Sequence, residues 1–465
     1  MDKIEQRIIE IIDQNAQRLI DFGTDIYEHP ELGYMEHRTA GKFAEQLRSL
    51  GLEPQEGLAV TGVKSYLKEP EEGELRLCLM GELDALCVPG HPFADPVTTA
   101  AHCCGHNAQL TGVLGAAIAL TDPEVKAALG GNVVFIGVPN EEAGTPDDVL
   151  AQLRAEGKVT HVGGKCEFIE IGAVDDIDLT VGHHTASGEA HISQVRNAPS
   201  MGMVRKFVTF KGKSSHPTRA GHAIDCQKTA ALTLNNVNAQ REALEWLWQP
   251  ARFMLHSQVM TGASAINVVS RECQMVFDIR AQAQPMINEL CYMADRAVEG
   301  AAIVTGAGYE SRIEPGYLPV VPVTDESAQV MIDTFKLVDP DTPVDYQGPK
   351  DFSGTTDYGD LSSVMPVMMF QTGGVGGQGH NVDWTVLDPY EFYVTTAKVF
   401  AIAAYKLMKD NCAFARKVVE QNPAQMTTQQ WRDLKREQAQ LKVKEMVPTP
   451  WFGPTLDAPN PPEKQ

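Results

Sequence analysis

The sequence has no long apolar run and few basic residues. Its longest apolar runs are far too short to span a bilayer. Met1 is followed by charged residues instead of a basic flank and an apolar stretch, so we expect no signal peptide. The sequence contains 39 Lys and Arg residues but 61 Asp and Glu residues, so its formal net charge is −22. This balance argues against nucleic acid and against an anionic membrane as partners.

The cysteines show no disulfide framework. There are nine, an odd number, and they are scattered through a chain of 465 residues. This usage fits free thiols in a reducing compartment, so we expect a cytoplasmic protein. The hydrophobic fraction of 43% and the charged fraction of 22% are ordinary for a globular protein. The length suggests about two to three domains.

Helix-like and strand-like patterns alternate in residues 1–192 and return in residues 314–412. Helical spacing occurs in 3–28, 39–50, 108–120, 324–338 and 388–407, and strand-like runs occupy 60–67, 75–80, 133–138, 179–182 and 367–371. We therefore predict an α/β fold in which a mostly parallel sheet is flanked by helices. Together the two segments would form one discontinuous domain.

Residues 193–313 show a different pattern of predicted helices and strands. Strand patterns at 204–211, 258–262, 265–269 and 274–280 accompany long helical patterns at 223–247 and 285–306. This composition predicts an inserted α+β domain. Residues 413–465 are predicted to form a C-terminal extension, with one helical stretch at 429–445 and a proline-rich end.

The most informative stretch is Ala101-His102-Cys103-Cys104-Gly105-His106-Asn107. On a loop or strand end, Cys104 and His106 can face the same metal ion, and Gly105 permits the turn between them. We expect Asn107 to cap the helix that follows. The alternative is that the cysteines and histidines of this stretch are ordinary core residues.

Ligand-type residues follow three predicted strands. Glu82 and Asp84 end one strand, Glu141-Glu142 follow another, and His183-His184 end a third. Open parallel sheets place their sites at the carboxyl ends of their strands. Adjacent carboxylates point to different sides, so one glutamate can bind metal while the other acts as a base. A pair of solvated surface glutamates is the alternative.

A glycine-rich loop spans residues 373–380 and ends in His380. No Lys-Ser/Thr pair follows it, as a phosphate-binding loop would require. We interpret it as a loop that lets the backbone approach a site closely.

Motifs in a fixed order carry a family resemblance. They are His29-Pro30-Glu31-Leu32-Gly33, Gly81-Glu82-Leu83-Asp84-Ala85-Leu86, Cys104-Gly105-His106-Asn107, Glu141-Glu142, His184, Ser215-His216, Asn267, Arg280, Thr356-Asp357-Tyr358-Gly359-Asp360 and Gly379-His380-Asn381. In this order the chain resembles metallopeptidase family 20, the group of aminoacylases, hippurate hydrolases and glutamate carboxypeptidases. It is most similar to the branch with p-aminobenzoyl-glutamate hydrolases and related dipeptidases. The resemblance covers residues 10–410.

The resemblance implies a site for two divalent metal ions. Its ligands would be Cys104, His106, Glu142, His184 and His380. Glu141 would be the general base, and Asp84 would orient a ligand. Thiolate, imidazole and carboxylate donors suit zinc, manganese, cobalt or nickel better than magnesium or calcium. Two metals that share a water can lower its pKa and polarise a scissile carbonyl.

The same resemblance assigns roles in the inserted domain, which would be a lid and dimerisation domain. His216 would stabilise the oxyanion, and Asn267 and Arg280 would anchor the substrate, with Arg280 gripping a carboxylate. The implied protein is a homodimeric amidohydrolase. Its substrate would be a small amide that carries a carboxylate: an N-acyl amino acid, a dipeptide or an aminobenzoyl-glutamate-like compound.

Several alternatives remain open at this point. Cys103 is a second thiol that could be a spare ligand or inert filler, and His183 competes with His184. We favour His184 because it lies six residues after Asp178, as in the proteins it resembles. The loop of residues 88–100 lengthens the approach to the metal loop. An N-carbamoyl amino acid hydrolase and a non-catalytic metal-bound subunit are the alternative functions, and the extra Glu141 argues against the second.

Overall fold

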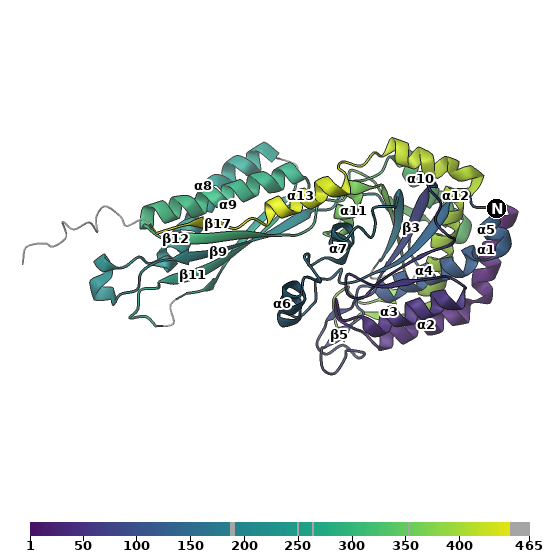
Figure 1. Cartoon of the computed structure of the whole chain (residues 1–465), viewed down its shortest axis with the longest axis horizontal. Coiled ribbons are helices and arrows are strands. Elements are labelled where there is room, and N and C mark those ends of the chain that lie inside the picture. Colours follow the sequence, from purple (N-terminus) through teal and green to yellow (C-terminus); the bar gives the residue numbers. More distant parts are fainter. Residues whose placement is uncertain (187–190, 249–250, 263–264, 352–353, 447–465) are drawn as a thin grey trace, which may run out of the picture. The chain divides into compact units, whose positions relative to one another are not determined.

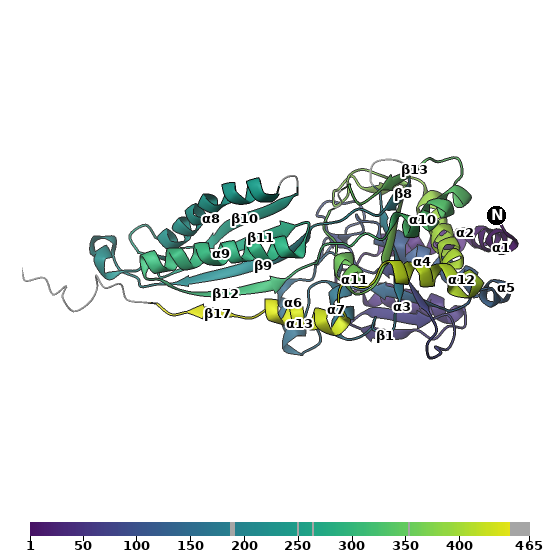
Figure 2. The same cartoon turned by 90° about the horizontal axis from the view of Figure 1, so that it is seen from above.

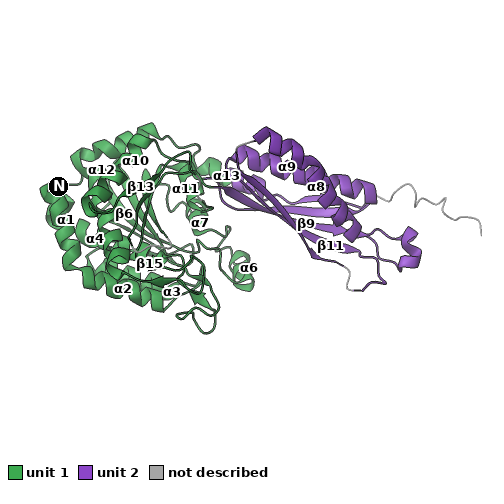
Figure 3. Cartoon of the chain, turned by 180° about the vertical axis from the view of Figure 1, so that it is seen from behind, with its two compact units in different colours: residues 1–200, 320–432 green, residues 201–319, 433–465 purple. Residues whose placement is uncertain are grey.

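The computed structural model describes residues 1–186, 191–248, 251–262, 265–351 and 354–446, so the proline-rich end of the predicted extension lies outside the described residues. The chain forms two compact units (Figure 3). Unit 1 comprises Met1–Ser200 and Val320–Arg432, and unit 2 comprises Met201–Pro319 and Asp433–Gln465. The expected domain boundaries at 192/193 and 313/314 thus differ from the observed division by several residues.

Unit 1 is built on an eight-stranded sheet with the order β1-β2-β6-β3-β7-β14-β8-β13. The four central neighbours β6, β3, β7 and β14 are parallel. Strand β2 runs antiparallel to β1 and β6, and β8 runs antiparallel to β14 but parallel to β13. The strands are β1 (Gln55–Leu58), β2 (Gly62–Tyr66), β3 (Arg76–Glu82), β6 (Asn132–Val138), β7 (Leu179–Thr185), β8 (Ser193–Arg196), β13 (Val344–Gln347) and β14 (Val367–Thr372). The predicted fold class, a mostly parallel sheet flanked by helices, is confirmed.

Helices cover both faces of this sheet (Figures 1 and 2). On one face, Phe370 of β14 packs against Phe400 of α12, with ring centroids 4.8 Å apart. On the other face, Gly182 of β7 lies against the ring of Tyr358 in α11. The helices of unit 1 are α1 (Lys3–Gln14), α2 (Ala16–Glu28), α3 (His37–Ser49), α4 (His106–Leu120), α5 (Pro123–Ala127), α6 (Asp147–Ala155), α7 (Gly164–Glu170), α10 (Asp325–Val338), α11 (Tyr358–Val364) and α12 (Thr396–Gln421).

The helix α4 is the central element of the core. Every one of its residues is buried, which explains why its sequence is apolar on all sides instead of amphipathic. It contacts α2, α12 and strand β3. Because α4 begins at His106, the most deeply packed helix of the unit also fixes the position of a predicted ligand.

Two predicted features of unit 1 differ in detail. The helix expected over 3–28 is interrupted at Asn15, where α1 ends and α2 begins. The helix after Asp388 continues beyond Leu407 to Gln421, although its backbone leaves the helical conformation at 409–412.

Unit 2 is an antiparallel sheet with two long helices. Its strand order is β10-β11-β9-β12-β17, and α8 and α9 pack against each other and contact the sheet. The elements are β9 (Gly202–Lys211), α8 (Cys226–Trp248), β10 (Phe253–Thr261), β11 (Glu272–Ala281), α9 (Gln284–Thr305), β12 (Gly308–Pro315) and β17 (Lys442–Lys444). Its core is a separate cluster that includes Phe210, Phe277 and Leu290.

Two predictions about these segments are wrong. Residues 265–269 form a turn instead of a strand, and the Ile266 side chain in this turn is fully exposed. The helix expected over 429–445 ends at Gln438, where α13 (Thr428–Gln438) stops, and Lys442–Lys444 pairs with β12 as β17. Among the described residues, no helix is both long enough and apolar enough to cross a membrane.

Candidate functional site

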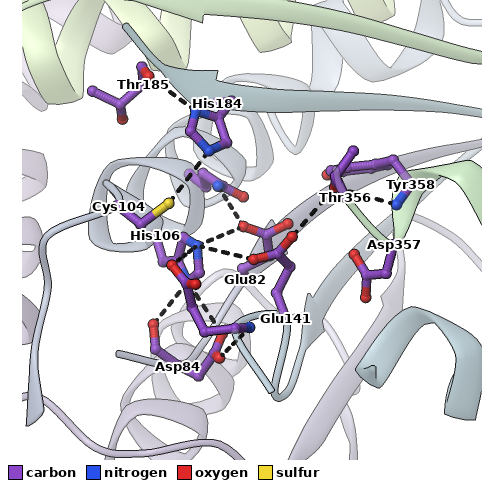
Figure 4. Close-up of polar contacts among 12 residues, drawn as sticks. Glu82, Asp84, Cys104, His106, Glu141, His184, Thr185, Thr356, Asp357 and Tyr358 are labelled. Carbon is purple, nitrogen blue, oxygen red and sulfur yellow. Dashed lines mark hydrogen bonds and ion pairs between the residues drawn. The ribbon is translucent and has the colours of Figure 1, made fainter. Parts of the chain in front are cut away.

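Ligand-type residues of unit 1 gather where its parallel strands end. Glu82 ends β3, Glu141 and Glu142 follow β6, and His184 lies near the end of β7. Figure 4 shows the side chains of Glu82, Glu141 and His184 pointing toward one another from their separate elements. The carboxyl ends of parallel strands share one edge of a sheet, so the topology brings together residues that are about 100 positions apart in sequence.

The Cys104 loop depends on a glycine. Gly105 has a φ of 89°, and a Cβ at this position would lie 1.8 Å from the hydroxyl oxygen of Thr185. Only glycine combines the left-handed backbone with this close approach. Gly105 is also the residue that precedes α4, so the expected cap by Asn107 is wrong: Asn107 lies inside the helix, and its Nδ2 donates to the Tyr393 hydroxyl at 2.9 Å.

His106 is oriented by Asp84. Its Nδ1 lies 2.8 Å from the Asp84 carbonyl oxygen and 3.1 Å from Asp84 Oδ1. Both neighbours are acceptors, so Nδ1 carries the proton and donates it. The other carboxylate oxygen, Asp84 Oδ2, accepts from the Glu142 backbone N–H at 3.0 Å. Asp84 therefore fixes the ring of one predicted ligand and the backbone of another.

The free ring nitrogen of His106 faces three carboxylates. Its Nε2 lies 2.9 Å from Glu82 Oε2, 3.8 Å from Glu141 Oε2 and 3.9 Å from Glu142 Oε1. Burial alone would lower the pKa of His106, but Glu82 and its other acidic neighbours raise that pKa well above its ordinary value. The site therefore favours a positive charge at this nitrogen.

His184 and His183 point to opposite faces of β7. His184 Nε2 lies 3.3 Å from Cys104 Sγ, on the side of the site. His183 Nε2 instead contacts the hydroxyl of Thr372 at 2.8 Å, and its ring packs on Phe370. This alternation along a strand places His184, and not His183, among the candidate ligands.

His380 is presented by a small hairpin in which β15 (Val375–Gly376) pairs with β16 (Thr385–Val386). Its backbone has a φ of 61°, and its N–H donates to the Cys103 carbonyl at 2.9 Å. Its Nε2 lies 3.2 Å from Glu142 Oε1, and its side chain is 54% exposed. The hydrogen bond from His380 to Glu142 raises the pKa of the imidazole.

The two adjacent glutamates have different surroundings. Burial raises the pKa of Glu142, but the hydrogen bond from His380 and the charge of His106 outweigh burial and lower it overall. Burial, followed by the charges of Glu82 and Asp357, raises the pKa of Glu141 well above its ordinary value. The two neighbouring carboxyl groups therefore differ: Glu142 loses its proton more readily, and Glu141 holds its proton more tightly.

Glu141 also receives a hydrogen bond from the Thr356 hydroxyl, at 3.3 Å. Thr356 belongs to the Thr-Asp-Tyr-Gly-Asp motif that contributed to the family resemblance. The motif therefore lies beside the predicted base.

The structure also contains a buried network of charged residues for which the sequence predicted no role. Lys165 Nζ lies 2.5 Å from Glu82 Oε1 and 2.5 Å from Asp357 Oδ1, and it sits 4.2 Å from the centre of the Tyr358 ring. Lys165, Glu82 and Asp357 are all essentially unexposed. Lys165 lies on α7, and no local pattern around it distinguishes it from a surface lysine. For Glu82, the acidic Gly81–Leu86 motif was the sequence feature that could have indicated a role in this network.

Several features of this cluster fit bound divalent metal. One donor atom from each of Cys104, His106 and Glu142 lies within 4.8 Å of the others, and the same holds for Glu82, His106 and Glu141. His106 Nε2 is buried and makes no hydrogen bond among the described residues. Burial and then Glu142 raise the pKa of the Cys104 thiol well above its usual value, a cost that a coordinated cation would remove.

Cys103 lies outside this donor cluster. It is buried among apolar side chains that include Trp384 and Phe392.

The preceding loop, residues 88–99, is closed at its base by β4 (Leu86–Cys87) paired with β5 (Ala100–Ala101). His91 of that loop contacts the Trp384 carbonyl at 2.9 Å.

The three predicted residues of the inserted domain belong to unit 2. His216 is exposed and contacts Thr218 Oγ1 through Nδ1 at 2.8 Å. Asn267 is exposed in the turn that replaces the predicted strand. Arg280, on β11, donates from Nε and from a terminal nitrogen to the two carboxylate oxygens of Asp278, each at 3.1 Å.

Comparison with known sequences agrees with this geometry. The sequence pattern of Peptidase family M20/M25/M40 matches residues 78–406. The chain is 28% identical over 443 residues to a human Xaa-Arg dipeptidase, a match that covers 87% of this chain and 88% of the relative. It is 25% identical over 332 residues to a p-aminobenzoyl-glutamate hydrolase component of Escherichia coli, which covers 69% of this chain and only 63% of that relative.

Solved structures show the same fold. A putative aminohydrolase from Staphylococcus aureus superimposes with a TM-score of 0.71 at 20% identity, covering 87% of this chain and all of that one. A Bacillus subtilis protein, described as a dinuclear metal binding peptidase from the M20 family, gives a TM-score of 0.64 at 20% identity over 85% of this chain and 99% of its own.

Proposed function

The chain belongs to peptidase family M20/M25/M40 and is a metal-dependent hydrolase, and from this premise we propose that it hydrolyses the amide bond of a small substrate that carries a carboxylate. N-acyl amino acids, dipeptides and aminobenzoyl-glutamate-like compounds are the candidate substrates. Relatives described as an Xaa-Arg dipeptidase, a component of p-aminobenzoyl-glutamate hydrolase and an N-acyl-L-amino acid amidohydrolase support this class.

The observation that carries the proposal is the pairing of Glu141 with Glu142 beside the donor cluster. Glu142 shares a cluster with Cys104 and His106, whereas Glu141 has the raised pKa expected of a base. A site that only bound metal would need the first carboxylate and not the second. The arrangement therefore supports hydrolysis over mere metal binding.

Cys104, His106, Glu142, His184 and His380 would hold two divalent ions. Sulfur, imidazole and carboxylate donors favour zinc, manganese, cobalt or nickel. When bound, such ions would acidify a water molecule and polarise a carbonyl group.

Glu141 would accept the proton of the attacking water and deliver it to the leaving amine nitrogen. The Thr356 hydroxyl donates to one of its carboxylate oxygens, and the other carboxylate oxygen faces His106. Asp84 would keep the His106 ring in the tautomer whose Nε2 is available to a metal. The water would attack the carbonyl carbon, and the C–N bond would break as the nitrogen receives the proton.

Unit 2 would complete the site as a lid. We propose that His216 donates to the developing oxyanion and that Asn267 and Arg280 contact the substrate. We further propose that α8 makes a two-fold contact between protomers, because Trp246 and Leu247 near its end are 85% and 70% exposed. Light scattering should give the mass of a dimer, and a monomeric mass would reject this contact.

The central experiment is an activity profile after reconstitution with manganese, zinc or cobalt. The panel should contain N-acetyl and N-benzoyl amino acids, dipeptides, p-aminobenzoyl-glutamate and an N-carbamoyl amino acid. We expect release of the free amino acid from at least one acyl or peptidyl substrate. Release of ammonia and carbon dioxide from the carbamoyl compound alone would reject the proposed substrate class in favour of carbamoyl hydrolysis.

A further inference from the structure

The strand β8 directs an arginine toward the metal cluster. Gln194 of β8 is paired with Gln371 of β14, which is in turn paired with His184 of β7. Directly paired residues point to the same side of a sheet, as do residues two apart on one strand. Arg196 therefore shares the face of His184, while Val195 between them belongs to the apolar core on the opposite face.

A contact supports this assignment of faces. Gln371 Nε2 lies 3.5 Å from His184 Nδ1, so the side chains on this face of neighbouring strands do meet. Arg196 stands two residues further along β8, opposite Met369.

The charge of Arg196 acts on the site itself. Burial lowers the pKa of Arg196, and the Cys104 thiol and Glu141 raise it. Cys104 and Glu141 therefore both lie within range of the charge of the Arg196 guanidinium.

The guanidinium of Arg196 nevertheless lacks a directly bonded partner among the described residues. Its guanidinium makes no ion pair or hydrogen bond with any residue that the structure describes, although the side chain is only partly exposed. Other half-buried arginines do have such partners: Arg38 pairs with Asp25 at 2.7 Å, and Arg280 pairs with Asp278 at 3.1 Å. A partly desolvated guanidinium without an anion is costly, so its position calls for an anionic ligand.

We propose that Arg196 binds the substrate's carboxylate, so that unit 1 carries its own carboxylate subsite beside the metal cluster. This inference rests on the amide substrate proposed above and adds which part of the substrate this unit recognises. The guanidinium group of an arginine is planar, and two of its N–H groups can donate to the two oxygens of one carboxylate. The guanidinium of Arg280 is less available to a substrate because it already donates two hydrogen bonds to the Asp278 carboxylate.

The test compares acids with their neutral amides. Glu141→Gln protein, reconstituted with manganese, would be titrated by calorimetry with N-benzoyl and N-acetyl amino acids and with the corresponding carboxamides. Adding Arg196→Gln should weaken binding of the best acid about 10- to 100-fold, the range for hydrogen bonds to a charged group, and leave its carboxamide unchanged. Arg196→Lys should restore part of the loss, because it returns the charge without the fork. Arg48→Gln is the control, since Arg48 is an exposed residue of α3.

Three results would overturn the inference. They are an equal loss for acid and carboxamide, a loss of manganese from Arg196→Gln measured by elemental analysis, and no acid in the panel binding more tightly than its carboxamide. Hydrolysis by the parent enzyme is scored separately. If no substrate is cleaved while the acid-specific loss is found, the hydrolase proposal fails and the Arg196 subsite stands; if cleavage is found without that loss, the reverse holds.

Discussion

The two units hold their predicted site residues in very different surroundings. In unit 1, Cys104, His106 and Glu142 are buried or nearly so and converge at one edge of a sheet. In unit 2, His216 and Asn267 are exposed, and Arg280 is paired with a neighbour on its own strand. The first group is preorganised by its own fold, whereas the second has no such cluster. Changes in unit 1 should therefore alter stability and metal content, and changes in unit 2 should alter substrate kinetics alone.

The largest effect should come from Lys165. Lys165→Met leaves Glu82 and Asp357 buried without their shared cation, which should destabilise unit 1 by about 3–5 kcal/mol. Urea unfolding at neutral pH measures this. The matched variant in unit 2 is Lys228→Met, whose pair with Asp225 is exposed on the lysine side and should contribute less than about 1 kcal/mol. Similar losses of unfolding free energy in the two variants would contradict the proposed difference between the units.

A pH dependence should follow from Glu36. Burial and the nearby charge of Asp84 raise the pKa of Glu36 to about 8, above its value in the unfolded chain, so the folded protein retains a proton that the unfolded chain releases. Its contribution to stability is complete at low pH and should fall by about 1.4 kcal/mol per pH unit from about pH 4.5 to pH 8. Glu36→Gln should remove this slope in urea titrations across that range. An unchanged slope would show that Glu36 does not titrate in this way.

Two neighbouring histidines distinguish the faces of β7. His184→Gln should lower metal affinity by more than about 10- to 100-fold, the loss typical of residues that only support a ligand. His183→Gln should keep the metal and lose only the packing and the contact with Thr372. Competition with a chelator, followed by elemental analysis, measures both. Equal metal loss in the two variants would contradict the assignment of faces.

The smallest effect should be at Arg280. If Arg280 contacts the substrate carboxylate, Arg280→Lys should raise KM and weaken turnover, because a point charge lacks the fork geometry. The change should be modest, about a few-fold, since Asp278 already competes for the fork. Steady-state kinetics with the best acid of the panel would measure it, and unchanged constants would remove Arg280 from the site.

The sequence predicted best what local periodicity and strand order control. The strands before Asp84, Glu141 and His184 could be recognised from their apolar runs, and the rule for parallel sheets then placed their ends together. The expected cap at Asn107 failed because its amide bonds with Tyr393, which lies 286 residues away in sequence.

Long-range partners set the remaining differences. The ion pairs of Lys165 join α7 to residues 83 and 192 positions away, and no local pattern encodes such contacts. The pairing of β17 with β12 likewise draws part of the predicted extension into the sheet of unit 2. That the Arg196 guanidinium bonds to none of the described residues likewise depends on neighbours far away in sequence.

The central claim is that Glu142 is a metal ligand and that Glu141, its neighbour, is the base. The most direct test measures metal content and kcat for Glu142→Gln and Glu141→Gln under one set of conditions. Glu142→Gln should lose metal, because an amide is a poorer ligand than a carboxylate. Glu141→Gln should keep metal near the level of the parent protein while kcat falls by at least about 100-fold. Metal loss from Glu141→Gln with retention in Glu142→Gln would reverse the two roles, and full activity of Glu141→Gln would contradict the glutamate-base mechanism.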